Sequence, residues 1–85
     1  MNNVNIIGML REKIDDLYRY FEYERPNDEN SKVDIALIPV RYWTNQPNNI
    51  VTSLPIHTRV AIQARLDAHE KFGTILVVEG IQKIN

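Results

Sequence analysis

Apolar and polar residues alternate most clearly over residues 58–68, which is the pattern of a β-strand with one buried face. The apolar positions of this segment are Val60, Ile62, Ala64 and Leu66. A polar connection, His69–Gly73, ends in a glycine, and a β-branched run, Thr74–Val78, follows and extends through Ile81 and Ile84. Two strands joined by a short connection that contains glycine predict a β-hairpin.

A second hairpin is predicted from the segments on either side of a dense turn signal, Pro26–Ser31. The segment before it, Tyr18–Arg25, holds aromatic and other strand-forming residues, of which we expect Phe21 to lie in the core. The segment after it, Val33–Trp43, is apolar on both faces near its middle and therefore predicts a largely buried strand. Because Pro39 cannot donate a ladder hydrogen bond, it indicates an edge, a bulge or a sharp bend at that point.

The remaining segments are less regular. Residues 44–57 contain two prolines and two adjacent asparagines, and can form at most a short helical turn around Asn49–Leu54. Residues 3–6 alternate as a strand does. Residues 7–21 fit either a helix or a strand, because their apolar residues also fall at helical spacing: Ile7, Leu10, Ile14, Leu17 and Phe21.

This ambiguity leaves two folds open for a single domain of residues 1–85. If residues 7–21 are extended, the chain has five strands in the order of an all-β, five-stranded Greek-key barrel, the OB-fold. The connection after the first strand then falls at about residues 12–16. If they are helical, the fold is α+β, with an N-terminal helix on an antiparallel sheet. In an OB-fold the ligand surface lies on strands 2 and 3, between the loops that join strands 1–2 and 4–5.

Composition narrows the functional classes. Ten Lys and Arg against eleven Asp and Glu give a formal charge of −1, which excludes a polycation that binds nucleic acid by bulk charge. Residues 1–34 carry five basic and eight acidic side chains (net −3), whereas residues 35–85 carry five and three (net +2). There is no cysteine, no apolar run long enough to span a bilayer and no signal-peptide pattern, so we expect a cytoplasmic protein with no membrane contact. A domain this small often depends on oligomerisation.

Five segments, in order, resemble those of bacterial and phage single-stranded DNA-binding proteins. They are the opening strand Asn3–Leu10, the Tyr23–Pro26 segment, the Ile-Pro strand Ile38–Trp43, the strand Thr58–Leu66 and the closing strand Val77–Gln82. The resemblance implies an OB-fold that binds single-stranded DNA (or RNA) without marked sequence preference, in replication, recombination or repair. It also implies a homo-oligomer, a dimer or a tetramer.

The chain also departs from that family. Thr44 and Asn45 stand in place of its Gly-Lys pair, and Ala64 in place of a strand glycine. Because the sequence stops at Asn85, directly after the last predicted strand, we expect a tail-less form that resembles the primosomal replication protein branch. Such a form has no acidic tail for recruiting partner proteins.

Binding a single strand requires aromatic faces for the bases and cations for the phosphates. The candidates are Trp43, Tyr42, Tyr18, Tyr20, Arg41, Arg59, Arg65, Lys71 and Phe72. The resemblance places Trp43 at a base-stacking position, although core packing is an equal alternative for it. Tyr42 points to the other side of the same strand, so if one of the two is in the core the other is at the surface. For the tyrosines, the alternative to a binding role is packing on the sheet. For Arg59 and Arg65, the alternative is an ordinary solvated side chain.

The rival function is a protein-interaction or oligomerisation module, in which the aromatic cluster is an interface and no nucleic acid binds. An enzyme is not expected. His57 and His69 are the only histidines, and the trio Asp67, His69 and Glu70 is an ordinary outcome in a polar loop, not a metal signature. The three glycines are isolated and form no phosphate-binding loop. We therefore expect neither a cofactor nor a metal.

Overall fold

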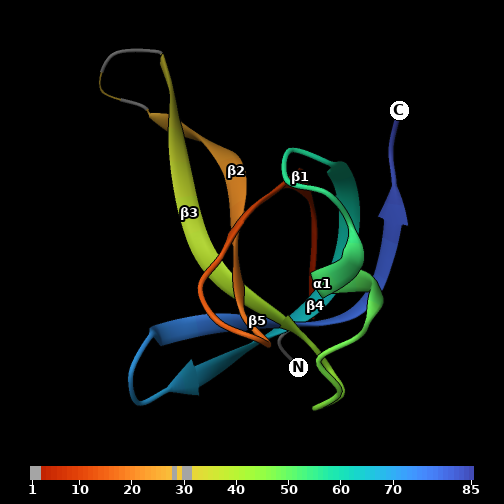
Figure 1. The fold of residues 1–85 in the computed structure, drawn as a ribbon. Helices are drawn as coiled ribbons and strands as arrows, with labels where there is room; N and C mark the ends of the chain where they lie inside the picture. The colour runs from red at the N-terminus through yellow and green to blue at the C-terminus, as the bar shows by residue number, and fades with distance from the viewer. Residues whose placement is uncertain (1–2, 28, 30–31) are drawn as a thin grey trace.

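The computed structural model describes residues 3–27, 29 and 32–85. Its elements are β1 (Asn3–Lys13), β2 (Arg19–Asn27), β3 (Lys32–Tyr42), α1 (Ile50–Ser53), β4 (Arg59–His69) and β5 (Gly73–Lys83). The strands close into a barrel in the order β1-β2-β3-β5-β4, with β4 returning to pair with β1 (Figure 1). The β3–β5 pair is parallel and the others are antiparallel. This is the OB-fold topology. The strand interpretation of the N-terminal segment is confirmed, and the α+β alternative is wrong.

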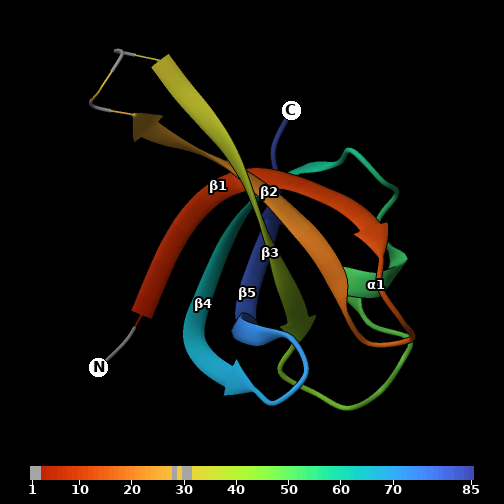
Figure 2. The ribbon, with the colours of Figure 1, turned by 90° about the vertical axis from the view of Figure 1, so that its left-hand side faces the viewer.

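Strand β1 belongs to both sides of the barrel. Its residues Asn3–Met9 pair with β4, and from Met9 onward it pairs with β2, so that the strand follows a long arc (Figure 2). Gly8 lies at this change of partner. A Cβ atom there would lie 2.2 Å from the carbonyl oxygen of Glu22 and 2.6 Å from the ring of Phe21. The crossing therefore requires a residue without a side chain.

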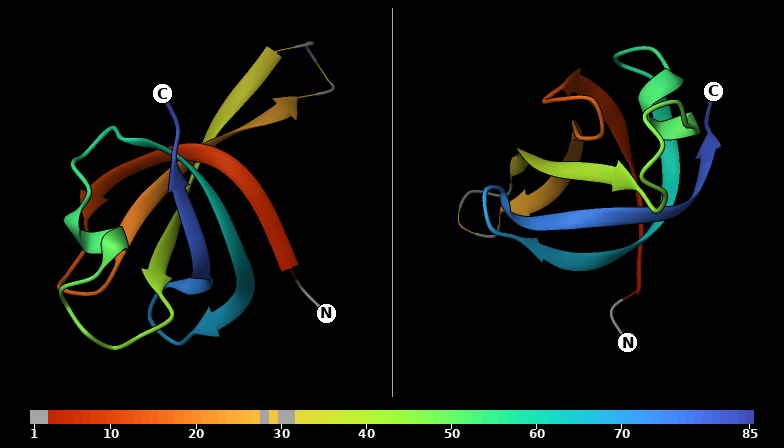
Figure 3. Two further views of the ribbon diagram at one scale, coloured as in Figure 1. Left: turned by 90° about the vertical axis from the view of Figure 1, so that its right-hand side faces the viewer. Right: turned by 60° about the horizontal axis from the view of Figure 1, so that its bottom comes forward.

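The barrel interior is apolar, as the alternation predicts. Its buried cluster consists of Leu10, Phe21, Val40, Val51, Val60, Ile62, Ala64, Leu76 and Val78. The prediction that Phe21 is a core residue is confirmed, because its side chain is fully buried. The inward series of β4 ends sooner than the pattern suggests: Leu66 is 43% exposed. The reason is that, among the described residues, β4 pairs with β1 only as far as Arg65, so Leu66 lies just past the contact that closes the barrel, where β4 continues with β5 as a hairpin (Figure 3).

The short helix α1 is the helical turn that the sequence predicts. Asn49 caps it: its side-chain oxygen accepts a hydrogen bond from the backbone N–H of Thr52 (3.0 Å), and its own N–H donates to the Thr52 hydroxyl (3.1 Å). The side chain of Val51 is fully buried in the core cluster and so anchors the helix there. The helix contacts β3 and β5 and so covers one opening of the barrel.

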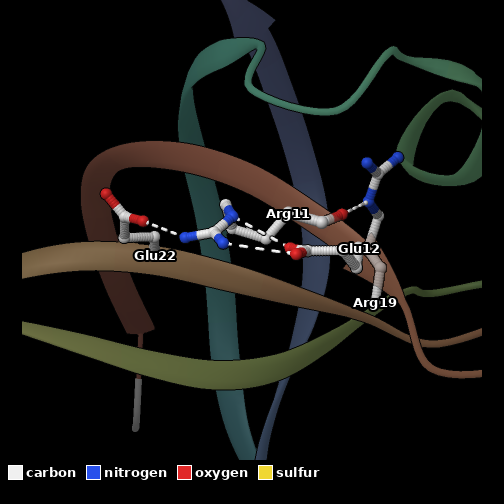
Figure 4. Close-up of polar contacts among 4 residues, drawn as sticks. All are labelled: Arg11, Glu12, Arg19 and Glu22. Atoms are coloured by element: carbon white, nitrogen blue, oxygen red, sulfur yellow. Dashed lines mark hydrogen bonds and ion pairs between the residues drawn. The ribbon is translucent and has the colours of Figure 1, made fainter.

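Arg19 ties this helix to the strands, which the sequence did not suggest. It is 2% exposed, and its guanidinium donates to the backbone oxygens of Arg11 (2.8 Å), Val51 (2.9 Å) and Leu54 (2.8 Å). Figure 4 shows the first of these bonds. Burial lowers the pKa of Arg19, because the charged form is partly removed from water. The three carbonyl oxygens compensate for that cost.

The predicted strand boundaries agree with the structure to within about two residues, except that β1 extends to Lys13 and the connection after it begins at Ile14. Of the predicted turn Pro26–Ser31, residues 28, 30 and 31 lie outside the described residues. Pro39 marks a strand edge as expected, since within the described chain β3 pairs with β5 from Val40 onward and not before it. Among the described residues, no helix has the length and apolar character that crossing a bilayer requires.

Candidate nucleic-acid interface

Trp43 lies on the outer surface of the barrel, immediately after β3. Its backbone N–H donates to the carbonyl oxygen of Val78 (3.0 Å), which fixes the start of the loop, while its side chain is 55% exposed. Tyr42 points inward and is half-buried against the core cluster, and its ring centroid lies 5.8 Å from that of Trp43. The prediction that one ring of this pair packs toward the core and the other lies at the surface is therefore confirmed, and the surface residue is Trp43. The expectation that Tyr42 stacks on a base is corrected, because strand alternation turns its ring into the barrel.

Tyr18 is also corrected, because it is only 8% exposed. The connection between β1 and β2 folds onto the outer face of β5, where Tyr18 packs with Ile75 and Val77. Asp15 shapes this connection, since its carboxylate accepts the backbone N–H groups of Leu17 (2.9 Å) and Tyr18 (2.8 Å). With its ring covered, Tyr18 supports the surface and does not offer a face to a base.

His69 completes this cluster and was missed by sequence reasoning. Its Nδ1 accepts the backbone N–H groups of Lys71 (3.0 Å) and Phe72 (3.2 Å), and so closes the β4–β5 turn. Its ring stacks on Phe72, with centroids 4.7 Å apart, and meets the edge of Tyr18 at 5.3 Å. The available signal was weak: a histidine three residues before an aromatic residue in a turn that ends at Gly73. Gly73 itself has φ +77°, as such a turn needs.

Tyr18, His69 and Phe72 together join the β1–β2 and β4–β5 connections on one side of the barrel. Tyr18 and Phe72 are 5.0 Å apart between centroids, so all three rings are in mutual contact. We call this group the ring cluster. The two loops that border the ligand surface of an OB-fold are thereby held in a fixed relation to each other.

Two predicted cations lie on the ring cluster. The Arg41 guanidinium carbon is 5.9 Å from the Tyr18 ring centroid, and Lys71 Nζ is 5.6 Å from that of Phe72. Arg41 is held further by hydrogen bonds to the carbonyl oxygen of Thr44 (3.2 Å) and the side chain of Asn45 (2.5 Å). Lys71 is exposed. Its ammonium group is accessible to a phosphate.

Arg65 belongs to the same surface and Arg59 does not. Val77 pairs with Arg41 on one side and with Arg65 on the other, so the two arginines flank one residue of β5. Arg65 makes an exposed ion pair with Glu79 (3.6 Å). Arg59 lies six residues earlier on β4, roughly 20 Å along the strand, and pairs with Met9. The prediction that groups Arg59 with the other cations is not supported by this placement.

Tyr20 remains a candidate. It is on the outer face of β2, opposite Pro39, and 38% exposed. Because Arg41 follows Pro39 at the next alternate position of β3, Tyr20 and Arg41 lie on the same outer face, and Trp43 comes directly after the end of the strand. Phe72 is half-buried, with one side occupied by the histidine.

The outer face of β2 turns acidic beyond Tyr20, where Glu22 and Glu24 follow at alternate positions. Arg11 bridges from β1 to Glu22 (2.5 Å) and also binds Glu12 (2.9 Å), as Figure 4 shows. These contacts raise the pKa of Arg11, chiefly through the hydrogen bond to Glu12 and then that to Glu22. The aromatic and cationic surface thus ends at Tyr20, and a phosphate chain would meet carboxylates farther along β2.

The trio Asp67, His69 and Glu70 does not form a metal centre. In residues 3–27, 29 and 32–85 no three potential ligands lie close enough together to hold a metal ion. One ring nitrogen of His69 is already engaged by the backbone.

No protein-family model matches this chain, and no curated protein matches it in sequence.

Proposed function

We propose that this OB-fold binds single-stranded DNA without marked sequence preference, with its bases stacked on Trp43 and Tyr20 and its phosphates near Arg41, Arg65 and Lys71. The observation that carries the proposal is the exposed indole ring of Trp43, beside Arg41, on the surface that OB-folds use for ligands. An exposed tryptophan that is not needed for the core offers a ring face that any base can cover.

The charge distribution sets what kind of binding to expect. Three cations, Arg41, Arg65 and Lys71, share this surface with Asp67, Glu70 and Glu79. The three positive and three negative charges cancel, so binding depends on stacking, with a small contribution from phosphates. Two or three phosphate contacts give a logarithmic salt slope of about −2 for a single strand. A family relationship to the single-stranded DNA-binding proteins, and a part in replication, recombination or repair, belong to this proposal.

The test is titration with oligo-dT, followed by Trp43 fluorescence and, for variants at that position, by the anisotropy of a labelled oligonucleotide. We expect quenching at low salt and a loss of roughly 1–3 kcal/mol in binding free energy for Trp43→Ala, with Trp43→Phe retaining most of the affinity. An oligo-rU arm measures the preference for DNA over RNA. No quenching at low salt, or equal affinities for the wild-type protein and Trp43→Ala, would contradict the proposal.

A matched pair of arginines tests the position of the phosphates. Arg65→Ala and Arg59→Ala remove the same charge from the same exposed face of β4. We expect Arg65→Ala to weaken binding several-fold and to reduce the salt slope by about 0.7, and Arg59→Ala to change neither. Equal effects would mean that only net charge matters and that the assigned surface is wrong.

The rival function is a protein-interaction or oligomerisation module. One specific observation supports this rival function: large aliphatic side chains are exposed on β3, away from Trp43. Binding through an apolar surface would respond weakly to salt, and oligo-dT would leave Trp43 fluorescence unchanged. The aliphatic surface can also coexist with nucleic-acid binding, because the two occupy different parts of β3.

A further inference from the structure

The β2–β3 hairpin extends beyond the barrel as a two-stranded arm, formed by residues 23–27 of β2 and 32–39 of β3 (Figures 1 and 2). Strand β1 pairs with β2 no farther along than Glu22, and β5 pairs with β3 from Val40 onward. Within the described residues, the two strands of the arm therefore pair only with each other. A two-stranded ribbon is marginally stable alone, and its free edges are templates for another strand.

The outer face of the arm carries an aliphatic row beside the free edge of β3. Val33 is 58% exposed, Ile35 62% and Leu37 50%. They alternate along the strand and so share one face. On β2 the residues opposite them are Pro26, Glu24 and Glu22. The apolar surface is thus on the β3 side of the arm, and the carboxylates are on its β2 side.

This charge pattern argues for a protein occupant. A phosphate chain laid along the aliphatic row would run beside Glu22 and Glu24. Aliphatic side chains also offer no aromatic face to a base. A strand with its own aliphatic row would instead gain both ladder hydrogen bonds and cross-strand apolar contacts.

The edge of β3 is complementary to itself. If two copies pair antiparallel about Ile35, each Val33 faces a Leu37 of the other copy, and the two Ile35 side chains face each other. Asp34 then faces Ala36, so no like charges are directly opposed. Asp34 is also near Arg25 of its own hairpin (3.9 Å), which offsets its charge on the other face of the arm.

We propose that the β3 edge from Val33 to Leu37 pairs antiparallel with the same edge of a second copy of this chain, about a two-fold axis at Ile35. The product is a four-stranded sheet, which is more stable than either two-stranded arm alone. A short edge buries less than a standard interface, so we expect a weak dimer that dissociates on dilution. This proposal does not rest on nucleic-acid binding, although Arg41 and Trp43 of both copies would lie on one continuous outer face.

The first test is the mass of the protein without nucleic acid, measured by sedimentation equilibrium over a hundredfold range of concentration. We expect a reversible monomer–dimer equilibrium. Ile35→Lys places two ammonium groups side by side on the axis and is expected to raise the dissociation constant at least about tenfold. Ile50→Lys, at an exposed isoleucine of α1, makes the same chemical change elsewhere and is the control. A wild-type protein that stays monomeric, or an Ile35→Lys variant that dimerises normally, overturns the proposal.

The second test does not depend on destabilising the arm. Because the chain contains no cysteine, Ile35→Cys introduces a single thiol. On the axis it meets its own copy at the distance a disulfide needs, whereas the thiols of Leu37→Cys dimers are about 13 Å apart in this register. Under mild oxidation we expect Ile35→Cys to cross-link at least about tenfold faster than Leu37→Cys. Equal rates would exclude the register. Neither of these two tests contains oligo-dT. Their results therefore do not depend on whether the protein binds single-stranded DNA.

Discussion

The loop end of the barrel and the β2–β3 arm differ in how their surfaces are supported. At the loop end, the ring cluster joins two connections that are far apart in sequence, and the backbone of the β4–β5 turn is bonded to His69. The arm has one hairpin partner for each strand, and its aliphatic row faces outward. In Figure 1 the arm rises at the upper left, and the β4–β5 turn lies at the lower left.

The difference shows that exposed aromatic and exposed aliphatic residues on the same small barrel suit different kinds of partner. Trp43 is presented from a position that is fixed by β5 and by the neighbouring loops, which suits a site that holds a ligand in a defined geometry. Within the described residues, Ile35 lies on the side of β3 that pairs with no second strand, which suits the addition of another strand. Substitutions can separate the two regions, first in the crossing of β1 that both share, then at the loop end, and finally in the Arg11 contacts that reach the base of the arm.

The largest effect is expected for Gly8→Ala, because both regions depend on the crossing of β1. The added methyl group would overlap the Glu22 carbonyl oxygen and the Phe21 ring. Neither can move freely, so we expect a loss of about 3 kcal/mol in the free energy of unfolding, measured by urea denaturation. Gly80→Ala is the control, since a Cβ there meets only Gln63, at 3.5 Å or more. Equal stabilities for the two variants would show that the crossing is looser than described.

A comparable effect is expected for Arg19→Leu, which tests how the loop end is anchored. The substitution keeps a large side chain but leaves three partly buried carbonyl oxygens without their donor. We expect a loss of about 2–3 kcal/mol, measured by the same denaturation experiment. Arg59→Leu, at an exposed arginine, should change stability by less than about 0.5 kcal/mol. If the two losses are alike, the hydrogen bonds of Arg19 do not hold α1.

A smaller and more local effect is expected for His69→Ala. The substitution removes two ring contacts and the acceptor of two backbone N–H groups. We expect a loss of about 1–2 kcal/mol and faster hydrogen exchange at the amides of Lys71 and Phe72. His69→Asn retains an acceptor without the imidazole ring and should protect those amides better than alanine does. Unchanged exchange in both variants would contradict the assigned role of His69, while amides of the arm provide an internal reference.

The smallest effect concerns Glu12, which binds Arg11, the residue that also binds Glu22 at the base of the arm. The pKa of Glu12 is lowered from its ordinary value of 4.5, first by a hydrogen bond from its own backbone N–H and then by Arg11. Because folding lowers this pKa, the charged carboxylate stabilises the fold above about pH 4.5, and that contribution is lost as the pH falls through the folded-state value. We therefore expect Glu12→Gln to be slightly less stable than the wild-type protein at pH 7, and the difference to shrink in acid. Thermal unfolding over this pH range measures it, and a difference that grows in acid would reverse the assignment.

The sequence predicted the barrel well where one face of a strand is buried. The alternation of β4 and the β-branched run of β5 depend on local sequence and on burial, so they were visible along the chain. Residues 7–21 were ambiguous because apolar residues at a spacing of three or four fit a helix as well as two strands joined by a turn. Only the pairing of β1 with both β2 and β4 decides between them.

The candidate site was predicted in part. The separation of Trp43 from Tyr42 follows from strand alternation, although which of the two faces outward does not. Tyr18 was misplaced because its burial depends on a loop that folds over β5, a contact between residues nearly 60 positions apart. His69 and Arg19 were missed for a related reason: their partners are backbone atoms, and backbone groups leave no residue-specific signal in a sequence.

The sequence by itself determined the two hairpins and most of the core, because alternation reports burial one strand at a time. The tertiary structure alone decided that residues 7–21 are not one helix, which aromatic rings are covered, which arginines share a surface and where, among the described residues, β3 has β2 as its one neighbouring strand. Those properties depend on the order in which strands close the barrel. Closure brings Arg41 and Arg65 to either side of Val77, and it leaves Ile35 on an open edge.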